Sequence, residues 1–555
     1  MILILVYWLF LFFLLLPFGM LVNKSLKLKT TNTCILLLLG LVALTLSFTV
    51  TAFFFSLGLY SILCYLFLNS LLYFIYHKEL KETLITFIRQ VQRLSLFYKS
   101  VLILLLLGAA LKSAQLPFII DNESYYIQTI KWVNEYGLVK GLANIHIYLA
   151  QVSPWHILQA GLNLSFLSTT FNDLNGFLFI ICILYCLLEP RNNEKSNKTT
   201  WFSLLPVVSI VFFLFLDAPS PDLPLLVITP LILYLYTREQ TLERFKISLI
   251  LFAFIAFIKI TILPVGILFL PALINRGKLL YFIKLLSVFA TIWIVKNIIV
   301  SGYPLYPFTF ITSGNDWVVP QAILDSINTI SHKDVYGVDS STSFIQKLIS
   351  WLQLDGIKGV FNKLIVFLFL IMLLFKKVRQ NKKYLVIYSA FLIHFITLLF
   401  ISPQYRFFLP EIMFFTLFII SEVVNYLNKE TFNTTVILGG VLLSFTLFVD
   451  FNFKPLTANK HHQSVSKLKA SQLYQPEPIT RYPEMKFIKK QVGKFEYYSP
   501  ETNFFIFGTG NGSLPCVNES QLDYFKQKTG YIPQPRGEFI EEGFISTKAL
   551  DNIIQ

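Results

Sequence analysis

Long uncharged apolar runs recur along most of the chain and alternate with short polar loops. Several runs approach the roughly 20 residues that an α-helix needs to cross a bilayer. The run at 101–120, for example, carries a single charge, Lys112. This pattern predicts an all-α polytopic membrane protein with about 14 transmembrane helices. The expected spans are 1–22, 34–53, 56–76, 101–120, 174–188, 201–216, 223–236, 247–258, 261–275, 285–300, 364–375, 384–401, 407–427 and 434–450.

The polar segments divide the chain into three regions. Residues 1–100 form N-terminal membrane helices, and the first run is expected to be a retained anchor, because it lacks a basic start and a small-residue cleavage site. Residues 101–450 form a transmembrane core with two large outer loops, 120–173 and 301–363, which contain amphipathic stretches. Residues 451–555 are polar, with strand-like, turn and short helical patterns, and predict a small α+β extracytoplasmic segment.

A formal net charge of +15 raises the question of nucleic-acid binding. The Lys and Arg residues, however, lie mostly in short loops between spans, such as 23–33, 77–99 and 376–383. This distribution is typical of cytoplasmic loops of membrane proteins, so no nucleic-acid partner is expected. The loops that alternate with them, including both large loops and the C-terminal segment, then lie outside the cytoplasm.

Two acidic residues follow directly on the apolar run at 101–120. Asp121 and Glu123 precede an amphipathic stretch whose one face carries Tyr126, Ile127, Ile130 and Val133. A carboxylate at the mouth of a membrane helix is costly unless it faces water or a cavity, so a catalytic general base is one interpretation. The competing interpretation is ordinary polarity at a helix start, where the helix dipole favours acids.

Three further charged residues stand at span ends on the outer side. Asp222 follows a Pro-rich turn and is a candidate to line a cavity, although a simple turn explains it equally. Lys259 interrupts an apolar stretch and is a candidate anion contact, the alternative being a side chain that extends to the interface. Arg406 suits phosphate, but an interfacial anchor or a pair with Glu411 remain open.

The histidines and cysteines carry weaker signals. His146 is placed in the substrate-binding set because it lies in the first outer loop, while His146 and His156 also fit polar interfacial side chains. No Cys-x-x-Cys, His-Glu-x-x-His, nucleotide-binding glycine loop or Gly-x-Ser-x-Gly motif occurs. Zinc proteolysis, ATP-driven transport and serine hydrolysis therefore have no support, and no metal ligand is assigned.

These features together resemble the C-type (GT-C) integral membrane glycosyltransferases. Those enzymes have an acidic residue at the start of a first large outer loop, matched here by Asp121 in IIDNESYY, and many have an Arg-aromatic element near a later span, matched by YRFFLP. The stretches EYGLVKGLANIHIYLAQVSPW, VSGYPLYP, GNGSLPC and EEGF are similar to a bacterial family of GT-C-like multispanning proteins whose members are largely uncharacterised. Where that family often has Tyr-His after the acidic pair, this chain has Tyr125-Tyr126.

The resemblance implies transfer of a sugar from a polyprenyl-phosphate donor to a glycan or lipid acceptor at the outer face of a bacterial plasma membrane. Asp121 would be the base of an inverting displacement, with Arg406 and Lys259 at the donor phosphate. Membrane lipids are the other expected partners. No cofactor is assigned, and a divalent metal stays open because some GT-C enzymes use one.

Other classes of protein share many of these features. A transporter or flippase of lipid-linked glycans predicts repeats and broken helices, and no repeat is visible. A glycan polymerase on another multispanning fold and a catalytically inactive membrane scaffold also remain alternatives, since a fold does not fix a function. Convergence of Asp121, Arg406 and Lys259 on one cavity would favour the enzyme.

Overall fold

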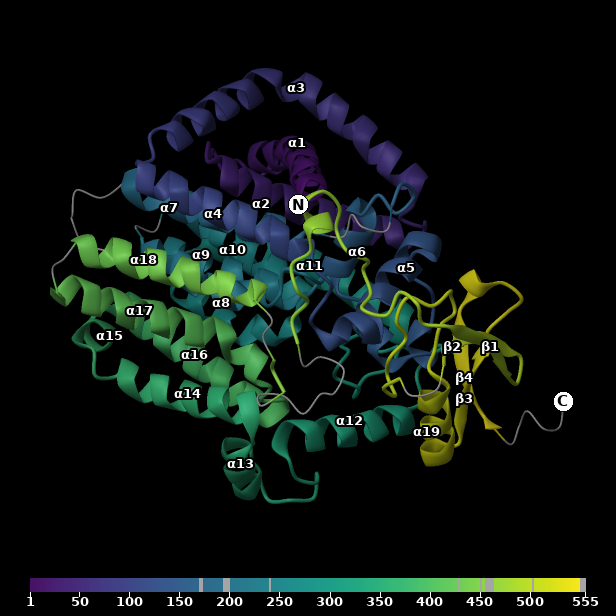
Figure 1. Cartoon of the computed structure of the whole chain (residues 1–555). Coiled ribbons are helices and arrows are strands. Elements are labelled where there is room, and N and C mark those ends of the chain that lie inside the picture. The colour runs from purple at the N-terminus through teal and green to yellow at the C-terminus, as the bar shows by residue number, and fades with distance from the viewer. Residues whose placement is uncertain are drawn as a thin grey trace.

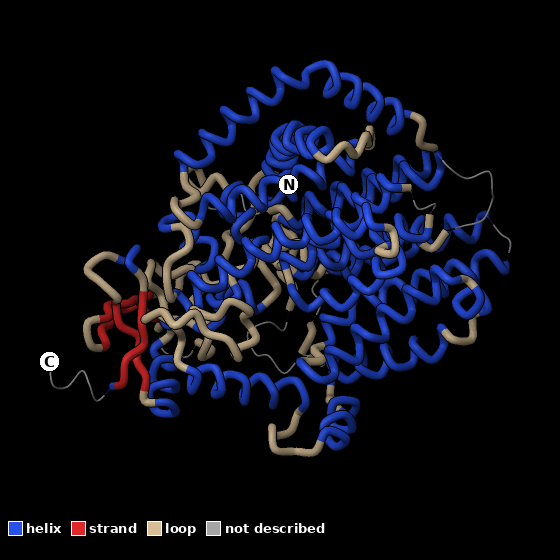
Figure 2. Tube along the Cα trace, turned by 180° about the vertical axis from the view of Figure 1, so that it is seen from behind, coloured by secondary structure: helices blue, strands red, loops and turns tan. Residues whose placement is uncertain are grey.

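The fold is mostly helical, with a small stranded region near the C-terminus (Figures 1 and 2). The computed structural model describes residues 1–168, 173–192, 200–238, 241–427, 430–449, 452–454, 464–501 and 504–549. Among the described residues, the larger of two clusters of buried hydrophobic side chains extends from the first helix to the strands. Seven of the described helices are long and apolar enough to cross a membrane, which is typical of an integral membrane protein.

The first four helices are long and apolar. Their bounds are α1 Ile2–Ser25, α2 Thr33–Ala52, α3 Leu59–Gln92 and α4 Leu96–Ser113. Helices α1 and α2 pack backbone against backbone, because a Cβ atom on Gly19 would lie 1.8 Å from the Leu36 carbonyl oxygen and one on Gly40 would lie 2.2 Å from that of Leu15. Small residues allow this close approach where water does not drive helices together.

Helix α3 arches over α1 in Figure 1 and corrects one sequence expectation. The segment 77–99 was expected to be a basic loop, but the helix continues to Gln92 and only bends at Tyr76, whose backbone angles (φ −107°, ψ 19°) are not helical. Its polar second half is therefore a helix with charged residues rather than a connection between spans.

The remaining α-helices form the body of the molecule. Their bounds are α5 Ile127–Tyr136, α6 Pro154–Leu162, α7 Asn175–Asn192, α8 Ser209–Phe213, α9 Asp222–Thr237, α10 Leu242–Ile258, α11 Arg276–Ser301, α12 Gln321–Tyr336, α13 Phe344–Gln353, α14 Gly356–Met372, α15 Lys376–Gln380, α16 Lys382–Ile401, α17 Leu409–Leu427, α18 Glu430–Ser444 and α19 Glu519–Thr529.

Short π- and 3₁₀-helices connect these elements. The π-helix is η1 Asn122–Tyr126, and the 3₁₀-helices are η2 Leu142–Asn144, η3 Ile147–Gln151, η4 Phe202–Val208, η5 Ile260–Ala272, η6 Tyr405–Phe408, η7 Phe445–Phe448, η8 Ala470–Leu473 and η9 Ile540–Glu542. Two predicted spans, 201–216 and 261–275, contain η4 and η5. Pro206, Pro264 and Pro271 remove backbone donors there, which disfavours a regular α-helix.

The amphipathic segments of the two large loops, 120–173 and 301–363, fold as helices. Tyr126, Ile127, Ile130 and Val133 are all buried, as the predicted face requires. Every residue of α6, which follows in the first of these loops, is also buried inside the protein.

The C-terminal segment forms two antiparallel hairpins and one helix. Strand β1 (Phe487–Val492) pairs with β2 (Phe495–Pro500), and β3 (Tyr531–Pro535) pairs with β4 (Phe544–Lys548). The registers join Phe487 to Pro500 and Tyr531 to Lys548. The predicted small α+β segment is therefore present in the described part of the tail.

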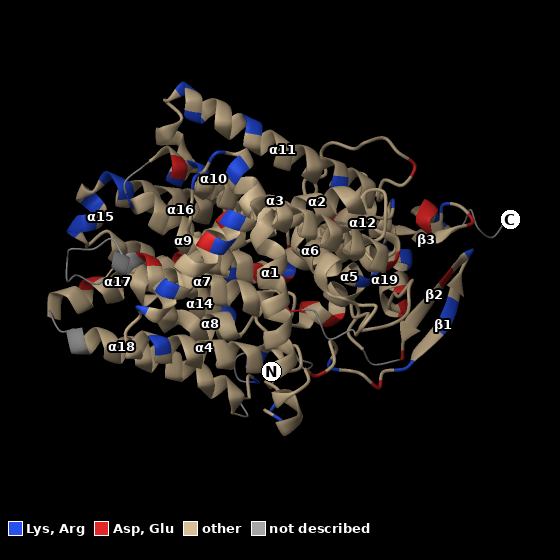
Figure 3. Cartoon of the chain, turned by 90° about the horizontal axis from the view of Figure 1, so that it is seen from above, with Lys and Arg blue, Asp and Glu red and all other residues tan. Residues whose placement is uncertain are grey.

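Charged residues are unevenly distributed over the molecule. Figure 3 shows Lys and Arg on α15 and at the start of α11, at the end of the molecule away from the strands. Asp and Glu positions are seen near the strands and the centre and also among these basic helices. The end formed by α15 and the start of α11 is therefore rich in Lys and Arg.

Candidate functional site

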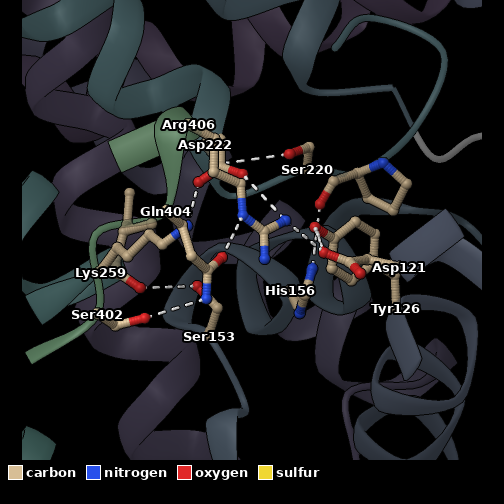
Figure 4. A network of polar contacts seen from close by, with 12 residues as sticks. Asp121, Tyr126, Ser153, His156, Ser220, Asp222, Lys259, Ser402, Gln404 and Arg406 are labelled. Carbon is tan, nitrogen blue, oxygen red and sulfur yellow. Dashed lines mark hydrogen bonds and ion pairs between the residues drawn. The ribbon is translucent and has the colours of Figure 1, made fainter. Parts of the chain in front are cut away.

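Four charged residues from distant parts of the chain meet in one network. Arg406 Nη1 donates to Asp121 Oδ2 at 2.6 Å, although the two residues are 285 positions apart. The same nitrogen lies 3.8 Å from Asp222 Oδ2, and Asp222 Oδ1 is paired with Lys259 Nζ. Figure 4 shows the Arg406 guanidinium between Asp121 on one side and Asp222 on the other.

Each of the four residues stands where a helix begins or ends. Asp222 is the first residue of α9, and Lys259 is the residue that follows α10. A helix start favours an acid and a helix end favours a base, so both positions suit their charges. Asp121 precedes η1, and Arg406 lies in η6 just before α17.

The network is balanced in charge and partly enclosed. Asp222 and Lys259 expose 5% and 18% of their side chains, whereas Asp121 and Arg406 expose 20% and 30%. Two carboxylates against two cations reduce the cost of removing charge from water. Because its Oδ2 carries the bond to Arg406 and no contact to Oδ1 is seen among the described residues, Asp121 keeps one carboxylate oxygen for another partner.

Neutral side chains hold this network in place. Arg406 Nε donates to Gln404 Oε1 at 3.0 Å, and the Tyr126 hydroxyl lies 3.5 Å from Asp121 Oδ2. The His156 ring packs against Tyr126 at an interplanar angle of 50°, with ring centres 4.6 Å apart, and its Nε2 bonds the Pro219 carbonyl at 3.0 Å. Burial lowers the pKa of His156 to about 3, so this ring is neutral.

Sequence reasoning missed three of these supporting residues. Tyr126 was interpreted only as a member of an apolar helix face, and His156 as an interfacial side chain, yet His156 is fully buried. For Gln404 the sequence offers one indication of a role in the network, namely its position two residues before Arg406.

Two cavities adjoin the network. The first, of about 480 Å³, is lined by Asp121, Arg406 and Gln404 together with Asp334 and Lys358. The second, of about 500 Å³, is lined by Lys259, Lys296 and Gln404 and by apolar side chains from α10, η5 and α11. Gln404 and Val335 border both, so the charged network stands between two neighbouring spaces. Both volumes lie in the range of small-molecule sites.

Glu123 was predicted to be catalytic, and its surroundings do not support that role. Its carboxylate is fully buried and accepts hydrogen bonds from Thr480 Oγ1 at 2.7 Å, Arg481 N at 2.9 Å and Asn122 Nδ2 at 3.2 Å. Its carbonyl oxygen accepts from the backbone of Thr509 and Gly510. Burial raises the pKa of Glu123, partly opposed by these bonds. Glu123 therefore fastens the C-terminal segment to the loop at 120–173.

His146 was predicted to bind substrate, and it also lies in that junction. Its Nε2 is 3.2 Å from the Phe507 carbonyl oxygen, and its Nδ1 accepts from the Tyr148 amide at 3.3 Å. It lines neither of the two cavities. Burial lowers the pKa of His146 to about 4. Both ring nitrogens are occupied by backbone groups, which makes His146 a structural residue.

Two further pairs of polar, ionisable residues lie in the apolar core, apart from the network. Glu411, considered above as a partner of Arg406, is paired instead with His394, whose Nε2 bonds the Thr261 carbonyl at 2.9 Å. Asp217, which fits a turn, is 2.7 Å from Lys112 in a pair with no exposure. In the first of these pairs Glu411 has a histidine as its partner, and in the second Lys112 and Asp217 neutralise each other.

Divalent metal was left open by the sequence. Among the described residues no group of three or more His, Cys, Asp or Glu side chains could hold a metal ion. In the network itself, both carboxylates are already bound to Arg406 or Lys259. The residues present therefore do not fit a metal.

The fold and the site define a helical membrane protein with a balanced charge network between two cavities. The model of a family described as a domain of unknown function (DUF8201) matches residues 1–413, and the chain belongs to that family. The match includes all four residues of the network. No curated protein and no solved structure is significantly similar to the chain.

Proposed function

We propose that this protein is a membrane glycosyltransferase that moves a sugar from a polyprenyl-phosphate-linked donor to a glycan or lipid acceptor. The observation that carries the proposal is the meeting of Asp121, Asp222, Lys259 and Arg406 between two cavities. A scaffold would have no need to gather these four charges beside open space. Transport is less well supported, since the charges sit at helix ends and not at broken helices.

The donor phosphate is assigned to the side of Lys259. That cavity is lined by two lysines, by apolar side chains and by neutral polar ones, and by no acid among the described residues. An anionic head group on an apolar lipid matches such a lining. Arg406 adds a planar donor that suits phosphate oxygens and stabilises the charge that grows as the phosphate leaves.

The acceptor is assigned to the side of Asp121. The free Oδ1 atom takes the proton of the acceptor hydroxyl, whose oxygen forms the new bond to the anomeric carbon. The old bond from that carbon to the phosphate oxygen breaks, and its electron pair leaves with the lipid phosphate. A single displacement with a base and no enzyme nucleophile inverts the anomeric centre.

The GT-C-like core, the orientation in the membrane and the number of spans are part of the same proposal. A GT-C-like core in a bacterial plasma membrane would place the network and the C-terminal segment outside the cytoplasm. The basic end formed by α15 and the start of α11 supports this orientation, because cytoplasmic ends of membrane proteins are rich in Lys and Arg (Figure 3). Some of the fourteen predicted spans would be shorter or irregular helices within the bundle.

A pulse-chase measurement in membranes tests the proposal. Membrane vesicles from a host strain lacking the protein are supplied with wild type or with Asp121→Asn, and the lipid carrier is loaded with radiolabelled sugar. Wild type should move label out of the carrier-lipid fraction into product, whereas Asp121→Asn should leave it on the carrier. Asp325→Asn, an exposed carboxylate on α12, is the matched control and should behave as wild type.

Label that never leaves the carrier in a wild-type-dependent way would overturn the transferase proposal. Equal transfer by wild type and Asp121→Asn, each present at the same folded amount, would remove Asp121 as the base.

A further inference from the structure

One buried cation beside the donor cavity has no acid to neutralise it. Lys296 lies on α11 with 3% exposure, and its Nζ donates to the Val152 carbonyl at 2.9 Å. No ion pair to Lys296 occurs among the described residues, while Lys259 is paired with Asp222. A buried ammonium that faces a cavity without a counter-ion is costly, so it either loses its proton or is kept charged by an anion that enters the cavity.

Lys296 and Lys259 belong to the same wall of this cavity. Val152, which accepts the bond from Lys296, is followed by Ser153, whose hydroxyl donates to the Ile258 carbonyl at 3.0 Å. Ile258 directly precedes Lys259. A short chain of contacts thus connects the two lysines, and both line the 500 Å³ space.

The two lysines differ in charge balance, because Lys259 has an acidic partner and Lys296 has none among the described residues. The network of Asp121, Arg406, Asp222 and Lys259 is neutral as a whole, so the cation left over in the lining is Lys296. We propose that the cavity binds a lipid diphosphate, with one phosphate at Lys259 and the second at Lys296. This inference rests on the proposed function and narrows its donor from a lipid phosphate in general to a diphosphate-linked sugar.

Two short soluble analogues test the assignment. Farnesyl phosphate and farnesyl diphosphate are titrated by calorimetry into the full chain, held in nanodiscs of neutral phosphatidylcholine at fixed salt. Wild type should bind the diphosphate more tightly by about tenfold, which corresponds to about 1.4 kcal/mol. Lys296→Gln should bind the two analogues equally, because the contact to the second phosphate is lost.

Two further variants keep the test decisive. Lys284→Gln removes an exposed lysine from the same helix and should keep the wild-type preference. Lys296→Arg retains the charge and should keep it as well, even if Lys296→Gln does not fold.

The possible failures are distinguishable. Measurable but equal binding of both analogues by wild type, or an unchanged preference in folded Lys296→Gln, would overturn the diphosphate assignment and leave the transferase proposal standing. Failure of wild type to bind either analogue would overturn both.

Discussion

Asp121 and Glu123 are only two positions apart, yet they lie in very different surroundings. Glu123 is enclosed, and each of its oxygens accepts bonds from the C-terminal segment or from Asn122. Asp121 lies beside a cavity and shares one oxygen with Arg406. A carboxylate saturated by protein donors holds a structure together, whereas a carboxylate with a free oxygen beside open space can accept a proton. The comparison assigns stability to one residue and chemistry to the other.

The largest expected effect is a difference in the rate of sugar transfer between variants of these two carboxylates. Asp121→Asn should lower sugar transfer by about 10²–10⁴-fold, the usual contribution of a general base. Glu123→Gln should lower it less than about tenfold, because it touches neither cavity. Initial rates in the membrane assay, corrected for folded protein, check the difference. A larger loss in Glu123→Gln than in Asp121→Asn would reverse the assignment.

Arg406 is expected to support use of the lipid donor through the several N–H groups of its planar guanidinium. Arg406 contacts Gln404 through Nε and Asp121 through Nη1, whereas lysine presents all its donors from one nitrogen and cannot reproduce this spacing. Arg406→Lys should therefore weaken donor use by about 10–100-fold. The measurement is kcat/KM for the lipid donor, with exposed Arg379→Lys as the control. Equal kcat/KM values in wild type and Arg406→Lys would mean that one positive charge suffices.

Removing the enclosed carboxylate should loosen the C-terminal segment. Glu123→Ala leaves Thr480 Oγ1 and the Arg481 amide without their acceptor, a loss of about 1–3 kcal/mol for each buried group. Limited proteolysis should cut the segment after residue 480 faster than in wild type. Glu135→Ala on the exposed side of α5 should digest at the wild-type rate, and identical digestion of both variants would contradict this role for Glu123.

The smallest effect is a pH dependence at the same junction. The folded pKa of His146 is lowered to about 4, below the unfolded value of about 6.5, so its stabilising contribution is present above pH 6.5. That contribution is lost as pH falls from 6.5 towards 4, because the unfolded chain takes up a proton first, with a cost on the order of 3 kcal/mol. Proteolysis of the tail should rise over this range.

A neutral variant isolates the contribution of this ring. His146→Gln should digest faster at pH 7 but with a shallower rise on acidification. An equally steep rise in His146→Gln would place the titrating group elsewhere, for example at His156, whose pKa is also lowered by burial, to about 3.

The sequence was sufficient to predict the helical membrane class, the small α+β tail and four members of the network. Charged residues are rare in apolar surroundings, so Asp121, Asp222, Lys259 and Arg406 stood out individually. Their pairing was not predictable: proximity in sequence suggested Glu411 for Arg406, whereas the partner is 285 positions away. Only the folded bundle brings these helix ends together.

Other differences have local physical reasons. Tyr126 and His156 support the network, but a buried aromatic ring gives the same pattern in any core. Proline-containing η4 and η5 are apolar enough to be counted as spans by hydrophobicity alone, although proline interrupts the helical hydrogen bonds. The buried acid Glu123 and the buried His146 were indistinguishable from site residues until the tail that covers them was placed.

The most direct test of the central claim is the mass profile of lipid-linked and surface glycans in the native host, with wild type and Asp121→Asn expressed at equal levels. If Asp121 is the base, one defined sugar should disappear from the product and its lipid-linked donor should accumulate in the variant. An unchanged profile in Asp121→Asn, in a host where deletion of the whole protein does change the profile, would contradict it.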